Sequence, residues 1–369
     1  MSTAELLQYP AAKDFINAKN KAAILVFKNT PQIERIVREN NWQLLNSPAE
    51  LSDKIEEKIM QVETLKNLKD LFLKYKILKG KDVKWPGTKF ILQFGHSHTG
   101  QGTYLIDSEK KLKDIVEKFP EREARISQFV DGPIFTNNNA LNGSSLIVGN
   151  ISYQITGLAP FTDKPFATIG NDWGLAQKLL MAEQKENYKT IVKAVGVELQ
   201  KLGWKGLFGV DVILDKAANK MYLIEINARQ PASTTFEAWR QRKKSPDGLT
   251  IFAAHLAALL GVDTDASSFT EIENSAQIIQ RITKEKPSAR AAAKLRAAGL
   301  AVIEYDNTDI GAELLRIQTD NSLMAGHNQL NSDGQKIVEL ISSENTLSAP
   351  TQALINSFFN LEIGGRKIS

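Results

Sequence analysis

Two apolar segments, residues 207–214 (LFGVDVIL) and 220–229 (KMYLIEINAR), most constrain how this chain can fold. In each segment one acidic residue, Asp211 or Glu225, stands between two β-branched apolar residues. The turn sequence DKAAN separates the segments, so they predict two strands that can pair as a hairpin. An unpaired carboxylate among buried side chains is costly, so each acidic residue needs a cation or strong donors beside it.

Side-chain alternation along the second strand places Glu225, Asn227 and Arg229 on one face, because they are two residues apart. In a hairpin Asp211 can reach the same face. Two carboxylates and an amide oxygen suit Mg²⁺, which completes its shell with water and substrate phosphates, and Arg229 suits a phosphate or a carboxylate. The spacing alone is equally compatible with a plain Glu225–Arg229 salt bridge at a sheet edge.

The glycine-bearing loop 95–102 (GHSHTGQG) lies between the predicted strands KFILQF and TYLI. Its glycines let the backbone approach an anion, and Ser97 and Thr99 add hydroxyl donors, so phosphate binding is one interpretation and a simple hairpin turn is the other.

The pair His96 and His98 in the same loop also allows a zinc site. Contact with phosphate or substrate is the preferred role, because zinc normally takes four N or S ligands and the chain has no cysteine.

The amino-acid composition excludes several classes of protein and of chemistry. A chain of 369 residues predicts two or three domains, and 42% hydrophobic with 24% charged residues excludes wholesale disorder. Without cysteine there can be no disulfide, thiolate metal site or cysteine nucleophile. The net charge of +4 does not indicate nucleic-acid binding. The N-terminal sequence lacks a signal-peptide pattern and no stretch is long and apolar enough for a membrane span, so the cytoplasm is expected.

The hydrophobic periodicity predicts a mixed architecture of α/β and α+β parts. A strand at 22–30 is followed by a helix at 31–41. Residues 48–76 have helical spacing, and residues 135–160 carry turn signals between antiparallel strands. The remaining predicted elements are a helix that Gly203 ends (189–203), an apolar helix (249–261), and a C-terminal lobe with an Ala- and Lys-rich stretch (284–298) and β-like segments (301–341).

Taken together and in this order, the segments resemble the ATP-grasp superfamily over roughly residues 50–262. The resemblance implies an ATP-grasp fold, in which two α+β subdomains sandwich ATP. It divides the chain into a short N-terminal Rossmann-like lobe (1–50), the ATP-grasp domain (51–265) with a hinge near 127–132, and a small C-terminal α+β lobe (266–369).

The resemblance also implies roles for individual residues. Asp211, Glu225 and Asn227 match the family's ligands for Mg²⁺, with Mn²⁺ as an alternative, and Arg229 matches the catalytic position that contacts phosphate or the acyl phosphate. Either Lys58 or Lys66 matches an upstream ATP-binding lysine, and Lys58 is preferred. Gln93 stands where the family has a phosphate-binding lysine, which is the main departure. The other expected nucleotide contacts are Thr99, Gly100 and Gly102 in the loop, and Gln128, Phe129 and Val130 in the hinge.

The implied activity is that of an ATP- and Mg²⁺-dependent ligase, which activates a carboxylate as an acyl phosphate and joins it to an amine. One alternative is a carboxylase-like enzyme that activates bicarbonate, and another is an ATP-binding module without catalysis, which Gln93 favours. The expected partners are a small carboxylate and a small amine, with no nucleic acid and no membrane. Family members are often dimers, so a homodimer is also expected.

Overall fold

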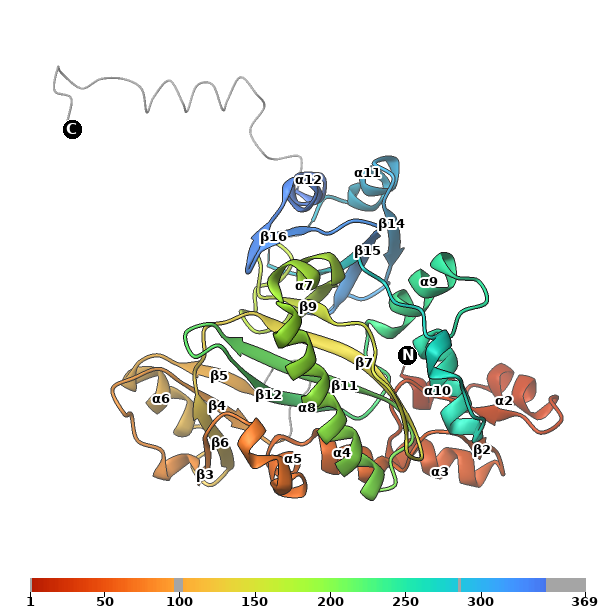
Figure 1. The fold of residues 1–369 in the computed structure, drawn as a ribbon, viewed down its shortest axis with the longest axis horizontal. Helices are drawn as coiled ribbons and strands as arrows, with labels where there is room; N and C mark the ends of the chain where they lie inside the picture. The colour runs from red at the N-terminus through yellow and green to blue at the C-terminus, as the bar shows by residue number, and fades with distance from the viewer. Residues whose placement is uncertain (1, 96–101, 285–286, 343–369) are drawn as a thin grey trace, which may run out of the picture.

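The computed structural model describes residues 2–95, 102–284 and 287–342. Within them, a parallel pair of short strands near the N-terminus precedes a four-stranded sheet and a nine-stranded sheet (Figure 1). The small sheet has the strand order β3-β6-β4-β5, and the large one has the order β12-β11-β7-β9-β10-β13-β15-β14, with β8 added beside β7. The candidate site lies where these two sheets face each other.

The N-terminal region contains a short β-α-β unit. Its elements are α1 (Thr3–Gln8), α2 (Pro10–Asn17), β1 (Ala23–Ile24), α3 (Pro31–Glu39) and β2 (Gln43–Leu44). The predicted helix at 31–41 is confirmed, but the predicted strand at 22–30 is only two residues long. Beyond Ile24 the side chain of Asn46 replaces a neighbouring strand, since its Oδ1 accepts from Val26 N at 2.9 Å and its Nδ2 donates to Val26 O at 2.7 Å.

The predicted helical stretch at 48–76 is interrupted. It forms α4 (Ala49–Glu56), α5 (Lys58–Thr64) and the 3₁₀ helix η1 (Lys66–Leu71), and strand β3 (Tyr75–Lys79) begins before its predicted end. The break falls at Glu57, whose backbone is extended and whose side chain accepts from Met60 N, so that it caps α5. This break turns the start of α5 towards the large sheet.

The small sheet carries its core on one face. Its other elements are η2 (Gly80–Asp82), β4 (Phe90–Phe94), β5 (Thr103–Ile106), α6 (Glu109–Val116) and β6 (Glu123–Gln128). Buried side chains from β4, β5 and β6 pack against Leu112 of α6. Ser108 caps α6, because its side-chain oxygen accepts a hydrogen bond from Lys111 N.

The large sheet is antiparallel throughout, and it extends into the C-terminal part of the chain. Its strands are β7 (Ile134–Asn142), β8 (Ser145–Ile147), β9 (Ser152–Thr156), β10 (Thr168–Asp172), β11 (Gly206–Asp215), β12 (Lys220–Asn227), β13 (Ala276–Arg281), β14 (Ala301–Glu304) and β15 (Glu313–Thr319). The antiparallel strands predicted for 135–160 are therefore confirmed. The pairing of β10 with β13 makes the C-terminal strands part of this same sheet.

Helices cover the large sheet and complete the C-terminal region (Figure 1). They are α7 (Trp173–Leu179), α8 (Ala182–Lys201), α9 (Thr234–Lys244), α10 (Ile251–Leu260), η3 (Ala266–Ser268), α11 (Ala291–Ala297) and α12 (Ser332–Ile341), with a small hairpin of β16 (Met324–Gly326) and β17 (Gln329–Leu330) before α12. The β-like interpretation of 301–341 is therefore wrong for its last ten residues, which form α12. Gly203 has a φ of +79° directly after α8, which explains the predicted end of this helix.

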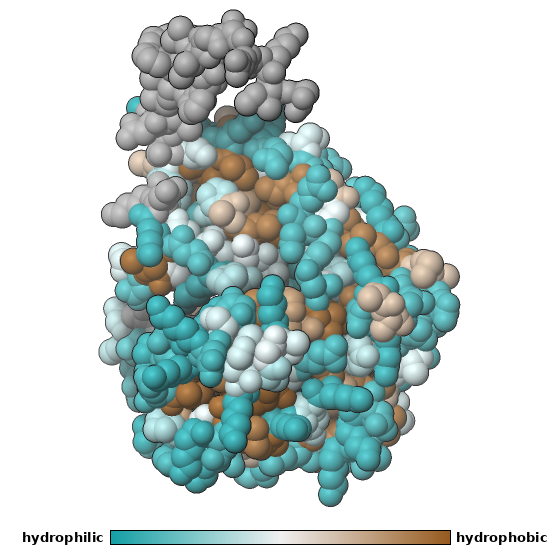
Figure 2. All heavy atoms as spheres, turned by 90° about the vertical axis from the view of Figure 1, so that its left-hand side faces the viewer, coloured by the Kyte–Doolittle hydropathy of each residue, from teal (hydrophilic) through white to brown (hydrophobic). Residues whose placement is uncertain are grey.

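The face on the left of Figure 1 is covered largely by hydrophilic side chains, with apolar patches among them (Figure 2). In the part of the chain that the structure describes, no helix is both long and apolar enough to cross a membrane.

Candidate functional site

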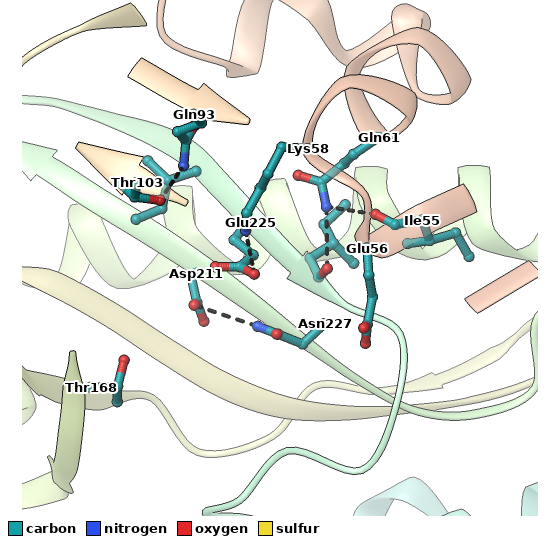
Figure 3. A network of polar contacts seen from close by, with 12 residues as sticks. Ile55, Glu56, Lys58, Gln61, Gln93, Thr103, Thr168, Asp211, Glu225 and Asn227 are labelled. Atoms are coloured by element: carbon teal, nitrogen blue, oxygen red, sulfur yellow. Dashed lines mark hydrogen bonds and ion pairs between the residues drawn. The ribbon is translucent and has the colours of Figure 1, made fainter. Parts of the chain in front are cut away.

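The two acidic residues of the hairpin lie directly opposite each other. Strands β11 and β12 pair in the antiparallel direction with Asp211 opposite Glu225 and Gly209 opposite Asn227. The predicted hairpin and its polar face are therefore present. Asp211, Glu225 and Asn227 gather where the large sheet faces the small one (Figure 3).

A β-bulge sits beside this carboxylate pair. Asp211 pairs with Glu225 while the next residue, Val212, pairs with Leu223, so Ile224 has no partner residue in the ladder. The carbonyl oxygen of Ile224 instead accepts from Nη2 of Arg125 on β6, at 3.3 Å. The bulge thus ties the carboxylate strand to a cation from the small sheet.

Asp211 is almost fully buried, with 5% of its surface exposed. Its Oδ1 accepts from Thr136 Oγ1 at 2.6 Å, and its Oδ2 accepts from Asn227 Nδ2 at 3.4 Å. Burial and the charge of Glu225 together raise the pKa of Asp211 to about 7. A cation between the two carboxylates would offset both the burial of Asp211 and its repulsion by Glu225. The carboxylate pair is therefore suited to binding a cation.

Glu225 keeps its charge with the help of Lys58. Burial alone would raise the pKa of Glu225, but the ion pair with Lys58 and the nearby charges of Arg229 and Arg125 lower it below its ordinary value. Lys58 is the first residue of α5, its side chain is 8% exposed, and Figure 3 shows it pointing at Glu225. Lys66, the other predicted candidate, lies exposed on η1. The structure thus brings Lys58 to the site and leaves Lys66 at the surface.

Arg229 is held between two acceptors. Its Nη2 donates to Asn227 Oδ1 at 2.7 Å, and its Nη1 forms an ion pair with Glu56 at the end of α4. About 29% of the Arg229 side chain stays exposed. Arginine has five N–H donors, so donors remain for an anion that binds beside the carboxylates.

Gln93 lies in the middle of the small sheet and is hydrogen-bonded on both sides. Its Nε2 donates to Thr103 Oγ1 at 3.2 Å, and its Oε1 accepts from Arg125 Nε at 3.0 Å. Arg125 is 5% exposed, and its Nη1 also reaches Lys58 O at 3.4 Å. Burial lowers the pKa of Arg125 to about 10, so its guanidinium stays charged at neutral pH. A cation therefore lies next to Gln93, although Gln93 itself is uncharged.

The remaining predicted nucleotide contacts divide into two groups. Gln128 is the exposed last residue of β6, and Phe129 and Val130 are half-buried in the connection that runs from the small sheet to the large one. Gly102 is buried, and its carbonyl oxygen accepts from Phe94 N at 3.0 Å. Thr99 and Gly100, like Ser97, His96 and His98, lie outside the described residues.

Sequence reasoning missed Arg125, Thr136 and Glu56. Arg125 gives a signal like the one that identified Asp211, because it is a charged residue between two apolar residues of a strand, Ala124 and Ile126. Thr136 and Glu56 give no such signal, since a threonine in a strand and a glutamate near a helix end are ordinary. Their roles depend on contacts between distant parts of the chain.

The residues fit a divalent cation that is shared with phosphates. The described residues contain no group of three or more His, Cys, Asp or Glu side chains arranged to hold a metal. Mg²⁺, however, is commonly bound by one or two carboxylates together with substrate phosphates. Asp211 and Glu225 supply two carboxylates, and Asn227 supplies an amide oxygen, which is the donor set that such a shared site needs.

Comparisons with known proteins agree with this arrangement. Residues 61–233 match the family model of the ATP-grasp domain. The [butirosin acyl-carrier protein]–L-glutamate ligase of Niallia circulans is 21% identical over 142 residues, which are 38% of this chain and 33% of that protein. The chain thus matches about a third of the length of this curated relative.

Solved structures share the fold over nearly the whole chain. The L-amino acid ligase from Bacillus licheniformis has a TM-score of 0.60 and 17% identity, covering 91% of this chain and 82% of that one. The N5-carboxyaminoimidazole synthase from Aspergillus clavatus, solved with ADP and 5-aminoimidazole ribonucleotide, has a TM-score of 0.60 and 13% identity, covering 93% and 89%.

Residues 61–233 thus match the ATP-grasp domain, and the whole described fold is similar to that of ATP-grasp enzymes. The predicted fold class is thereby confirmed, and the likeness extends beyond residues 50–262 into the C-terminal region.

Proposed function

We propose that this protein is an ATP- and Mg²⁺-dependent ligase that activates a carboxylate as an acyl phosphate and joins it to an amine. The observation that carries the proposal is the facing pair Asp211 and Glu225, with Lys58, Arg125 and Arg229 around it, between the two sheets of an ATP-grasp domain.

In this proposal the charged residues have two roles, which are to bind the cation and to stabilise the transferring phosphoryl group. Lys58 and Arg125 keep Glu225 ionised, and Thr136 donates to Asp211, so both carboxylates can face a cation. A bound Mg²⁺ supplies charge neutralisation for the phosphate groups. Arg229 lies on the same side of the hairpin and stabilises the negative charge that develops on the transferring phosphoryl group.

The names of the related proteins support the ligase class. The curated relative is named a glutamate ligase, and one neighbour in fold is an L-amino acid ligase. Both names indicate an amino acid as a substrate of those proteins, so we propose an amino acid or a similar small molecule as the carboxylate or the amine here. Arg125 beside Gln93 weakens the case for a module without catalysis, because the position lacks a lysine but not a nearby cation.

The proposal is tested by measuring ADP release from the full chain with Mg²⁺-ATP and a panel of amino acids, dipeptides and small dicarboxylates. Hydroxylamine in the same reactions traps an acyl phosphate as a hydroxamate, which reports carboxylate activation directly. The Asp211→Asn variant is the matched control. Stimulation by bicarbonate alone would favour the carboxylase-like alternative, and a panel that never exceeds the substrate-free rate would refute the ligase.

Three expectations from the sequence also stay proposals. They are the domain limits 1–50, 51–265 and 266–369, a cytoplasmic location, and a homodimer. Sedimentation equilibrium of the full chain tests the last of these, since a mass near 41 kDa identifies a monomer.

A further inference from the structure

The segment that follows β12 is held by the N-terminal part of the chain at three successive residues. Ala228 O accepts from Ser52 Oγ at 2.7 Å, Arg229 pairs with Glu56, and Gln230 N donates to Phe27 O at 3.3 Å. Ser52 and Glu56 lie one turn apart on α4, so a single helix provides two of these contacts.

Glu56 is the central residue of this arrangement. Its side chain is 9% exposed, and its two carboxylate oxygens have different partners. Oε1 meets Arg229, while Oε2 accepts from Lys28 Nζ at 2.7 Å. Figure 3 shows Glu56 on the side of the site where Asn227 lies. A nearly buried carboxylate between two cations has little freedom to move, and it limits the movement of its partners.

The contacts continue from Glu56 to the carboxylate pair. Arg229 donates to Asn227 Oδ1 at 2.7 Å, and Asn227 Nδ2 donates to Asp211 Oδ2 at 3.4 Å. An arginine side chain loses substantial conformational entropy when it is fixed. Because Glu56 holds one terminal nitrogen and Asn227 holds the other, that ordering is complete before any phosphate arrives.

Lys28 compensates the charge of Glu56, so Arg229 does not balance that carboxylate alone. Lys28 Nζ lies 2.7 Å from Glu56 Oε2 and 3.8 Å from Oδ1 of Asp53, whose side chain is 53% exposed. Because water screens the exposed Asp53, its charge acts weakly at this distance, and Lys28 acts mainly on the nearly buried Glu56.

We propose that Glu56 is the positioning residue for Arg229 and that Lys28 is its counter-ion. The inference rests on the proposed function, because it assumes that Arg229 meets a transferring phosphoryl group. Glu56 forms its ion pairs with Lys28 and Arg229, and among the described residues no hydrogen bond or ion pair joins it to Asp211 or Glu225. It acts by fixing the angle at which Arg229 is presented to the phosphoryl group.

The test uses the full chain, Mg²⁺-ADP, and tetrafluoroaluminate as a mimic of the transferring phosphoryl group, with affinities from calorimetry. In the wild type, tetrafluoroaluminate should tighten ADP binding. In Glu56→Gln, the affinity for ADP alone should stay within about twofold while the tightening falls about tenfold, the loss expected for one partner of a charged group. Arg229→Ala should lose the tightening as well, and the double variant should lose no more than Arg229→Ala.

Two further variants keep the test decisive. Glu50→Gln changes an exposed glutamate of the same helix, which pairs only with Lys54 in the described residues, and should leave both affinities unchanged. Lys28→Met should reduce the tightening in the same direction as Glu56→Gln, so the inference can be judged even if Glu56→Gln does not fold.

The outcomes separate this inference from the proposed function. Additive losses in the double variant, or an equal loss of ADP affinity in Glu56→Gln, would overturn the positioning role alone. So would an unchanged tightening in Glu56→Gln. A wild type that binds ADP but gains nothing from tetrafluoroaluminate would refute the phosphoryl transfer, and the role of Glu56 would fall with it.

Discussion

Acid should destabilise this protein through His255, a buried histidine on α10. His255 is 5% exposed, and its Nδ1 accepts a hydrogen bond from Leu207 N at 3.0 Å. Burial lowers the pKa of His255 from 6.5 to about 4. Because the folded pKa is the lower one, the unfolded chain binds a proton between these values that the folded chain excludes. Stability is therefore complete above pH 6.5 and is lost as the pH falls.

The size of the effect follows from the two pKa values. Each unit of pH between them costs up to ~1.4 kcal/mol, which amounts to about 2 kcal/mol at pH 5 and about 3 kcal/mol near pH 4. Other acid-sensitive groups add to the measured total, so the contribution of His255 must be isolated with a variant. His255→Asn is suitable, because the Asn Oδ1 can accept from Leu207 N in place of Nδ1 and does not titrate.

The assay is urea unfolding of the wild type and of His255→Asn at several pH values from 8 to 5. The wild type should lose about 2 kcal/mol more than the variant over this range. Parallel curves for the two proteins would show that His255 does not titrate differently in the folded and unfolded states, and the reasoning from its burial would be wrong.

Three other predictions concern the site and its surroundings. Arg125→Met leaves three carbonyl or amide acceptors without their charged donor and should lower the free energy of unfolding by about 2–3 kcal/mol in urea, so an unchanged midpoint would contradict it. Burial raises the pKa of Glu237 to about 7, so its contribution to stability is complete below pH 4.5 and is lost as the pH rises to 7, opposite in sign to that of His255; in thermal unfolding, Glu237→Gln should therefore gain more stability, or lose less, than the wild type between these pH values, and parallel curves would contradict it. Glu225→Ala should weaken Mg²⁺-ATP binding about tenfold or more in calorimetry, whereas equal affinities would refute the site.

The sequence predicted the parts of the site that depend on local geometry. Alternation along one strand was enough to group Glu225, Asn227 and Arg229, and a short turn was enough to bring Asp211 opposite them. The preference for Lys58 over Lys66 agrees with their burial, but it came from a family resemblance. No local pattern connects Lys58 with Glu225, because their contact depends on how α5 packs against the large sheet.

Other features depended on contacts that periodicity cannot reveal. The strand at 22–30 was expected to be long, yet Asn46 takes over its hydrogen bonds after two residues. The sequence also did not predict that β13, β15 and β14 continue the large sheet through β10. Pairing between strands that are far apart in sequence is decided by the whole core, which explains why short patterns did not predict it.

The bulge at Ile224 changes which residues of β12 face the core, so the alternation of side chains differs before and after it. Its core residues are Met221, Leu223 and Ile226, so their spacing changes from two to three where the bulge occurs. Before the bulge the odd-numbered residues face the core, and after it the odd-numbered Glu225 faces the site. Removing or adding one residue in this strand would therefore keep either the apolar core or the carboxylate pair in register, but not both. The length of this one strand is as much a requirement of the chemistry as the acidic side chain itself.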